Sequence, residues 1–312
     1  MGFAEGGLEG EKVFEGKIFP RTYLPPDETK AGASDLAKLV TGERKALWEA
    51  LEQHGALLFR GFRVDAAEDL TGVVEAFGWE EMPYSYGRTM KAHRVFTASE
   101  DPVDKFINFH HEMSLVNESC SKMFFYCQQP SPENGQTAIL RSDVLAKRME
   151  EELPEVVAML EEEGIRKVVR TAAGGEGDRK QGWQQMFKTE DEKDARQRAV
   201  EELGCDTVKL NEDGTAEFVY GPMNPMRVYG GRKVWWHSLH GHQGEERSMT
   251  VELGEGGPLP PAVVDIYSSV LEENGVDVKW RKGDVLVVDN LHAQHARRPG
   301  KDPRVVLVSL CK

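Results

Sequence analysis

The chain has 312 residues and is 39% hydrophobic, which is enough to bury a sizeable core in one large domain or two ordinary ones. This composition excludes disordered and fibrous proteins. The formal net charge is −14 at pH 7. An acidic surface repels phosphate backbones and anionic lipid heads, so we expect neither nucleic acid nor a membrane as a partner.

The apolar runs are the size of strands. Residues 55–59 and 285–288 are examples, and both are far shorter than the roughly 20 residues that span a bilayer. The N-terminal segment, MGFAEGGLEGEKVFEG, is acidic and lacks the basic start and apolar stretch of a signal peptide. We therefore expect a cytoplasmic protein. The four cysteines form no CxxC pair, so neither a zinc knuckle nor a disulfide framework is indicated.

The first half of the chain predicts one helix followed by strands. Residues 43–54 have apolar side chains at helical spacing and lead directly into the strand-like segment GALLFRGF. Polar or Pro/Gly punctuation then separates three expected strands, at Lys105–Met113, Lys122–Cys127 and Thr137–Arg141. Only residues 1–10 and the Gly-rich segment 172–177 read as loose or flexible.

The second half predicts helices and strands in alternation. Helices are expected after a cap at Ser142 to about Glu151, from Pro154 to just before Gly164, from a capping box at Thr189–Glu192 to Gly204, and over Pro261–Asn274. Strands are expected at Ile165–Arg170, Val285–Val288 and Arg304–Leu310, with Asp289–Pro299 as the connection between the last two.

Many short strands with a few inserted helices indicate a mainly β protein with α elements (α+β). We predict a double-stranded β-helix, or jelly roll, whose helices pack outside and are inserted between strands. The sequence contains neither an internal repeat nor a long linker, so a single domain over residues 1–312 is the simplest organisation.

The segment Asn108-Phe-His-His-Glu-Met113 is the richest in chemistry. On a strand, His110 and Glu112 would project from the same face, and His111 would point the other way. A histidine beside a carboxylate supplies two of the three ligands of a 2-His-1-carboxylate triad on non-haem Fe(II). The second histidine must come from elsewhere, and Asp289-Asn-Leu-His-Ala-Gln-His-Ala296 offers either His292 or His295.

From about residue 40 to the C-terminus the sequence resembles the taurine dioxygenase and clavaminate synthase-like (TauD/TfdA) family of Fe(II)/2-oxoglutarate oxygenases. In that family a helix and a strand like HGALLFRGF precede an H-x-D/E ligand pair, and a DN-x4-H segment brings the distal ligand. Here the resemblance implies His110, Glu112 and, after Asp289-Asn290, His295 as the metal ligands. It implies that His292 is structural.

The resemblance also implies two residues that anchor the far carboxylate of 2-oxoglutarate. The family places a Thr 27 residues after the first ligand, which is Thr137 here. It places an Arg about ten residues after the distal histidine, and Arg304 matches. A guanidinium binds a carboxylate through two hydrogen bonds, which an ammonium does less well. Arg297 and Arg298 are the alternatives for this role.

The activity that the resemblance implies is oxidation of a small polar molecule, such as an amino acid or a derivative, with O2 and 2-oxoglutarate as cosubstrates and release of succinate and CO2. Hydroxylation is expected, with desaturation as a second outcome. Taurine itself is disfavoured, since Val308 stands where taurine-type members have a second Arg. Glu112 argues against halogenation, because halogenating relatives have a small residue there.

Residues for the prime substrate are indicated only weakly. Asn108 shares the face of His110, Arg94 precedes the metal strand, Trp183 follows the Gly-rich segment and His237 follows a Trp pair.

Two other classes of function remain open. One is a zinc hydrolase with the same His/Glu/His site, and the other is a non-catalytic jelly roll that binds a metal or ligand. The oligomeric state is left open.

Overall fold

The computed structural model describes residues 2–27, 29, 31–83, 88–99, 101–116, 118–171, 182–243 and 247–312. The Gly-rich segment 172–177 therefore lies outside the described residues. Contacts divide the chain into two compact units. The first consists of residues 1–112, 120–144 and 274–312, and the second of residues 113–119 and 145–273. The single domain expected over the whole chain stays a prediction.

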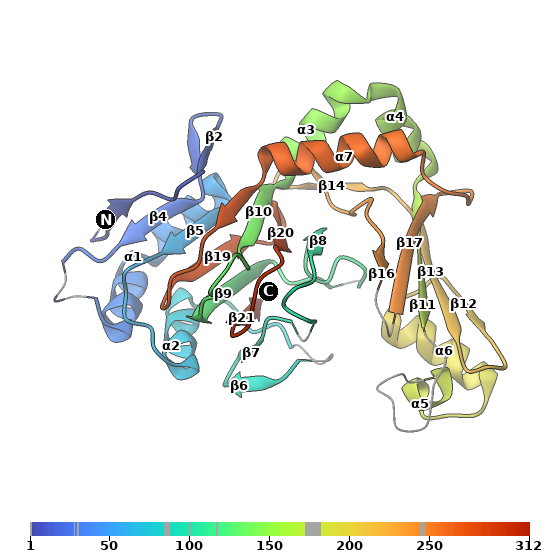
Figure 1. The fold of residues 1–312 in the computed structure, drawn as a ribbon, viewed down its shortest axis with the longest axis horizontal. Helices are drawn as coiled ribbons and strands as arrows, with labels where there is room; N and C mark the ends of the chain where they lie inside the picture. Colours follow the sequence, from blue (N-terminus) through green and yellow to red (C-terminus); the bar gives the residue numbers. More distant parts are fainter. Residues whose placement is uncertain are drawn as a thin grey trace. The chain divides into compact units, whose positions relative to one another are not determined.

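Two sheets form the first unit (Figure 1). The larger has the order β1 (Ala4–Gly6), β4 (Arg21–Leu24), β5 (Ala56–Phe59), β19 (Val285–Asp289), β9 (Lys122–Gln129), β21 (Val305–Cys311), β7 (Val95–Thr97) and β6 (Met90–Ala92). The smaller has the order β18 (Val276–Val278), β10 (Thr137–Arg141), β20 (Ala293–Arg297) and β8 (Ile107–His110). A short hairpin, β2 (Lys12–Phe14) and β3 (Lys17–Phe19), accompanies them. This double sheet confirms the predicted jelly-roll core.

Two helices, α1 (Ala33–His54) and α2 (Ala67–Phe77), cover one face of the larger sheet (Figure 1). Side chains alternate along β9, so that Phe124 and Tyr126 belong to the core shared with these helices. Phe125 lies between them in the sequence and lines a cavity on the other face. The sheet thus has one face for stability and one face for a site.

Helix α1 begins ten residues earlier than the predicted helix over 43–54. Its first half has the buried Leu36 and Val40, and non-helical dihedral angles at Glu43 divide it from the second half. Gly55 ends the helix in the left-handed region, at φ +77°, where a side chain would be strained. Within residues 1–10, β1 pairs with β4 and Phe3 is buried, and the flexibility expected for this segment stays a prediction.

The second unit has its own five-stranded sheet, in the order β12 (Thr207–Leu210), β13 (Ala216–Met223), β11 (Ile165–Thr171), β17 (Arg247–Leu253) and β16 (His242–Gln243). A separate hairpin joins β14 (Met226–Tyr229) and β15 (Arg232–Trp235). The helices of this part of the chain are α3 (Ser142–Glu152), α4 (Pro154–Glu163), α5 (Trp183–Phe187), α6 (Glu192–Leu203) and α7 (Pro261–Asn274).

One helix start differs from its prediction. The side chain of Asp191, and not that of Thr189, caps α6, because it accepts hydrogen bonds from the backbone N–H groups of Lys193 and Asp194.

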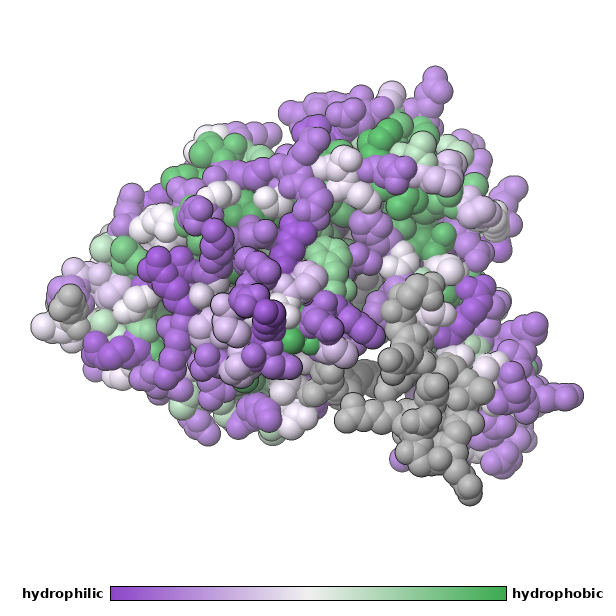
Figure 2. Space-filling model, in the orientation of Figure 1, coloured by the Kyte–Doolittle hydropathy of each residue, from purple (hydrophilic) through white to green (hydrophobic). Residues whose placement is uncertain are grey.

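Hydrophilic residues are spread over much of the described surface in view (Figure 2). Among the helices of the described residues, none combines the length and apolar character needed to cross a membrane.

Lys167 is an unusual residue of the second unit. It lies in the middle of β11, opposite Tyr220 and Val251, and is only 3% exposed. Its side chain forms neither a hydrogen bond nor an ion pair with the residues that the structure describes. Burial lowers its pKa to about 8. Since the unfolded chain binds the proton more tightly than the folded one, this charge costs roughly 3 kcal/mol of stability below pH 8.

We therefore expect Lys167→Met to raise the midpoint of thermal unfolding by several degrees at pH 7. This advantage should shrink as the pH rises from 8 toward 10, because the lysine of the wild-type protein then becomes neutral in the folded state. Lys209→Met, an exposed position of β12, is the matched control and should change little. An advantage that is the same at pH 7 and pH 10 would contradict the expectation. Differential scanning calorimetry measures both variants.

Candidate metal centre and cosubstrate cavity

His110 and His295 meet across two strands of the smaller sheet. The antiparallel pairing of β8 with β20 places them directly opposite each other, and their ring centroids are 4.3 Å apart. The segment 289–299 was expected to be a connection, but it contains β20, a fully buried strand that pairs with β8 on one side and β10 on the other. Strand register therefore brings two histidines together that are far apart in the sequence.

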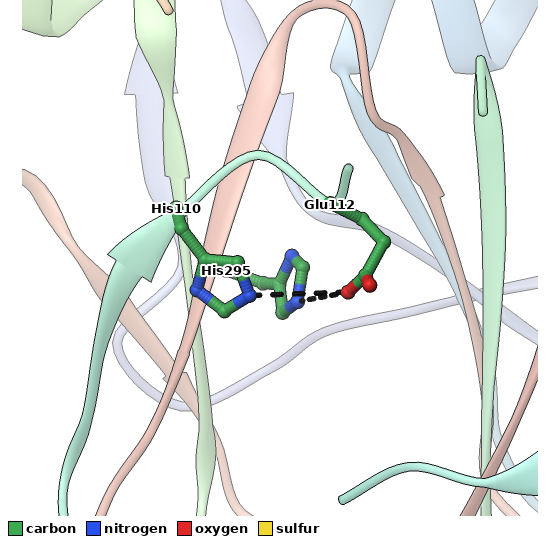
Figure 3. A group of neighbouring side chains, drawn as sticks. All are labelled: His110, Glu112 and His295. Atoms are coloured by element: carbon green, nitrogen blue, oxygen red, sulfur yellow. Dashed lines mark ion pairs between the residues drawn. The ribbon is translucent and has the colours of Figure 1, made fainter. Parts of the chain in front are cut away.

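Glu112 completes the cluster from a turn. Its Oε2 lies 3.8 Å from Nε2 of His110 and 3.7 Å from Nε2 of His295 (Figure 3). The sequence predicted that His110 and Glu112 lie close together because they share one face of a strand. The two side chains are close, but the strand explanation is wrong, because β8 ends at His110. The chain turns there, with Met113 at φ +59°, and the turn directs the carboxylate toward both rings.

Asn290 holds this turn in place. Its side-chain Oδ1 accepts a hydrogen bond from the N–H of Glu112 (2.9 Å), and its Nδ2 donates to the carbonyl oxygen of Glu112 (3.0 Å). The same Nδ2 donates to the carbonyl of Cys120 at 2.8 Å. Asn290 is fully buried. The Asn of the DN-x4-H segment thus joins the turn that has Glu112 to the turn that leads to His295.

The two other histidines of these motifs face away from the cluster. His111 lies between the backbone carbonyl of Asn290, to which its Nδ1 donates, and the hydroxyl of Ser142, which is 2.8 Å from its Nε2. His292 Nδ1 is 3.0 Å from a carboxylate oxygen of Asp289. Both side chains are buried, and both are engaged in fixing the backbone near Asn290.

The electrostatics of the cluster suit a divalent cation. Burial opposes ionisation of Glu112, but the Arg88 guanidinium and the neighbouring histidines hold the pKa of its carboxyl well below the usual range. Burial lowers the pKa of His295 well below 6.5, which keeps this ring neutral. Nδ1 of His110 is 2.8 Å from the carbonyl of Asn108, and donation to it leaves the Nε2 lone pair for a metal.

The donor set passes a geometric test for a metal ion. The three ligand atoms lie within 4.8 Å of one another. Two donor atoms that bind one ion at right angles, each about 2.1 Å from it, are about 3 Å apart. The three ligand atoms would therefore have to move only slightly closer together to bind one ion. Two neutral imidazoles and one carboxylate are the ligands of a non-haem Fe(II) triad. The site formed by His110, Glu112 and His295 therefore fits Fe(II).

A cavity of about 160 Å³ opens beside this cluster within the first unit. Thr137 and Arg304 both line it. One guanidinium nitrogen of Arg304 is 3.4 Å from Oγ1 of Thr137, and its Nε donates to the carbonyl of Gly135 at 2.7 Å. Burial, together with nearby Arg297, lowers the pKa of Arg304 to about 10, so the side chain is still cationic at pH 7.

Position 135 requires a residue without a side chain. Its φ is +71°, and a Cβ there would lie 2.7 Å from Cβ of Ser131 and 3.1 Å from Cδ of Arg304. The absence of a side chain lets Arg304 approach the backbone and reach Thr137. This explains, in physical terms, the glycine that precedes Thr137 by two positions.

The two alternative arginines are engaged elsewhere. Arg297 lines the cavity, but its guanidinium donates to the backbone carbonyls of Asp101, Pro102 and Lys105. Arg298 pairs with Asp277 at 2.9 Å and does not line the described cavity. Arg304 is therefore the arginine that the structure brings to Thr137.

The four weak candidates for substrate contact are not gathered at this cavity. Asn108 contributes its carbonyl to His110, and Arg94 donates to the carbonyl of Trp79 and to Sγ of Cys311, outside the lining of the described cavity. Trp183 and His237 belong to the second unit, where both are buried. Trp183 is part of an apolar cluster there. Their binding of a substrate stays a prediction.

Sequence reasoning missed Arg88. One of its terminal nitrogens is 3.0 Å from Oε1 of Glu112, and the residue lines the cavity. It lies 24 residues before Glu112, in a segment with no recognisable metal motif. No spacing in the sequence indicates that this arginine reaches the cluster.

Comparisons with known proteins identify a family and relatives that match most of the chain. The family model of the taurine catabolism dioxygenase TauD, TfdA family matches residues 21–310. A clavaminate synthase-like protein of Arabidopsis thaliana is 40% identical, over 99% of this chain and 98% of its own length. The dapdiamide synthesis protein DdaC of Enterobacter agglomerans is 27% identical, over 84% of this chain and 83% of its own.

The fold has solved counterparts. The crystal structure of PvcB from Pseudomonas aeruginosa has a TM-score of 0.58 at 14% identity, with 100% of this chain and 92% of that one covered. Such a likeness bears on the fold alone. The family match extends over nearly the whole chain and includes the cluster and the cavity. The chain belongs to the TauD, TfdA family and is a dioxygenase of the 2-oxoglutarate-dependent class.

Proposed function

We propose that this dioxygenase hydroxylates, or desaturates, a small polar molecule such as an amino acid or a derivative, and releases succinate and CO2. In this proposal His110, Glu112 and His295 hold Fe(II). Thr137 and Arg304 hold the far carboxylate of 2-oxoglutarate. The observation that supports it best is that the ligand cluster and the Thr137–Arg304 pair line the same cavity.

Iron and 2-oxoglutarate, when bound, supply the oxidising chemistry with O2. The chain's own residues supply position and charge. The buried carboxylate of Glu112 and the neutral ring of His295 offer ligands that need not lose a proton at pH 7. Arg304 and Thr137 offer a cation and a hydroxyl side by side, which suits a carboxylate. Apolar Phe125 and Val306 help to line the cavity and limit the room for water.

The alternatives are less well supported. A zinc hydrolase would not need residues such as Thr137 and Arg304 to hold the carboxylate of a cosubstrate beside its metal. The match to a dioxygenase family also disfavours a hydrolase. A non-catalytic binding protein would show no 2-oxoglutarate turnover. PvcB is described as an Fe, alpha-ketoglutarate dependent oxygenase from an isonitrile synthetic pathway, and DdaC as a dapdiamide synthesis protein. Both names support a small-molecule substrate.

The cytoplasmic location expected from the N-terminal sequence stays a prediction, as do the expectations that neither nucleic acid nor a membrane is a partner.

The ligand assignment predicts which variants lose iron. Anaerobic addition of Fe(II) and then 2-oxoglutarate to the wild-type protein should give the weak visible band of a chelated keto acid. His110→Ala and His295→Ala should weaken Fe(II) binding more than about 100-fold, because each removes one of three ligands. Calorimetry under nitrogen measures this affinity.

His292→Gln is the matched control, since His292 belongs to the same segment as His295 but bonds to Asp289 instead. It should keep Fe(II) affinity within a few-fold of the wild type. Equal losses in His292→Gln and His295→Ala would show that the ligand assignment is mistaken. The absence of a visible band from metal-loaded wild-type protein would favour the zinc or binding-protein alternative.

The cosubstrate assignment predicts a separate effect. Arg304→Gln should weaken 2-oxoglutarate binding about 10- to 100-fold, the cost of a lost charge-assisted contact, with Fe(II) affinity unchanged. Titration of the visible band with 2-oxoglutarate gives the dissociation constant. Arg298→Gln, whose side chain pairs with Asp277, should bind 2-oxoglutarate as the wild type does. If only Arg298→Gln weakened binding, the anchoring role would move to Arg298.

A further inference from the structure

The two carboxylate oxygens of Glu112 have different partners. Oε2 faces Nε2 of both histidines, at 3.8 and 3.7 Å. Oε1 faces away from them and is 3.0 Å from a guanidinium nitrogen of Arg88. Both side chains are largely withdrawn from solvent, at 14% exposure for Arg88 and 8% for Glu112. Burial strengthens this ion pair relative to one on the surface.

The backbone that follows Arg88 is held by hydrogen bonds to β7. Thr89 and Thr97 are joined by two hydrogen bonds, from Thr89 N–H to the Thr97 hydroxyl (3.0 Å) and from Thr97 N–H to the Thr89 carbonyl (2.9 Å). Thr97 lies on β7, which pairs with β21 in the larger sheet. Arg88 therefore approaches Glu112 from a segment that the sheet holds, independently of the Asn290 contacts that hold the backbone of Glu112.

A carboxylate can ligate a metal through one oxygen or through both. The difference matters in a triad, because a second carboxylate oxygen would occupy a position that cosubstrates need. An oxygen that accepts a charge-assisted hydrogen bond from a buried guanidinium is held toward that cation and is a weaker metal ligand than an oxygen without such a partner. In this structure that oxygen is Oε1.

We propose that Arg88 is a positioning residue that restricts Glu112 to ligation through Oε2 and so keeps a coordination position open for 2-oxoglutarate. This inference rests on the proposed function. It assigns Arg88 a task other than substrate binding, even though the residue lines the cavity.

The effects of removing Arg88 on metal affinity and on 2-oxoglutarate affinity distinguish a positioning role from a merely structural one. A guanidinium close to the ligand cluster repels a divalent cation and draws carboxylate charge toward itself. Loss of Arg88 should therefore leave metal affinity intact or increase it, while 2-oxoglutarate binds more weakly because Oε1 competes for its position. A structural defect would instead weaken the binding of both.

The test compares Arg88→Met, which keeps much of the stem without the charge, with Arg88→Lys, which keeps a cation. Arg44→Gln is the control, because Arg44 donates to the carbonyl of Ala76 away from the cavity. Anaerobic calorimetry gives the Fe(II) affinity, and the visible band gives the 2-oxoglutarate affinity and the spectrum of the complex.

We expect Arg88→Met to bind Fe(II) at least as tightly as the wild type and 2-oxoglutarate at least 10-fold more weakly, with a shifted or missing band. Arg88→Lys should recover part of the loss, and Arg44→Gln should match the wild type. An unchanged 2-oxoglutarate affinity in Arg88→Met would overturn the inference, as would parallel losses of both affinities. If the wild type gives no band, the proposed function fails, and the inference fails with it.

Discussion

The two-way hydrogen bonding between the Asn290 amide and the backbone of Glu112 is the constraint on which the site depends. Glu112 lies beyond the end of β8, so strand pairing does not place it. A backbone turn could present its carboxylate in several directions, and the rigid planar amide of Asn290 selects one. Since Asn290 is fully buried, each of these hydrogen bonds is expensive to lose without replacement.

The smaller sheet places the other groups. His295 on β20 lies opposite His110 on one side and Ile139 on the other. Two residues along, Arg297 lies opposite Thr137. Side chains two apart on a strand share a face, so the two histidines of the metal cluster and Thr137 of the carboxylate anchor lie along one face of the smaller sheet. A shift of this register by one residue would turn His295 away from His110.

Much of this arrangement could be predicted from the sequence. The HxE segment indicates two candidate ligands by itself, and the resemblance to the TauD/TfdA family adds His295, Thr137 and Arg304 through the positions of its motifs. The helix starts at Ser142, Pro154 and Pro261 were predicted because caps and prolines are local signals. Such features depend on few residues, and those residues are close together in the chain.

The remaining features depend on contacts between distant segments. Strand β20 reads as a connection because its polar residues, which include Gln294 and His295, are buried between two partner strands. Arg88 reaches Glu112 from a segment that is hydrogen-bonded to β7, which in turn pairs with the distant β21. The reason for the convergence of His110 and Glu112 was also missed, since it lies in the contacts of Asn290 and not in strand alternation. Tertiary structure decides such features.

The most direct measurement is the Fe(II) affinity of Asn290→Leu, a variant that fills a similar volume but cannot hold the Glu112 turn. If the amide fixes the ligand geometry, the folded variant should bind Fe(II) about 10- to 100-fold more weakly, as is typical when a residue that orients a metal ligand is lost. Circular dichroism and the thermal midpoint establish that the variant is folded. Wild-type Fe(II) affinity in a folded Asn290→Leu protein would contradict the account.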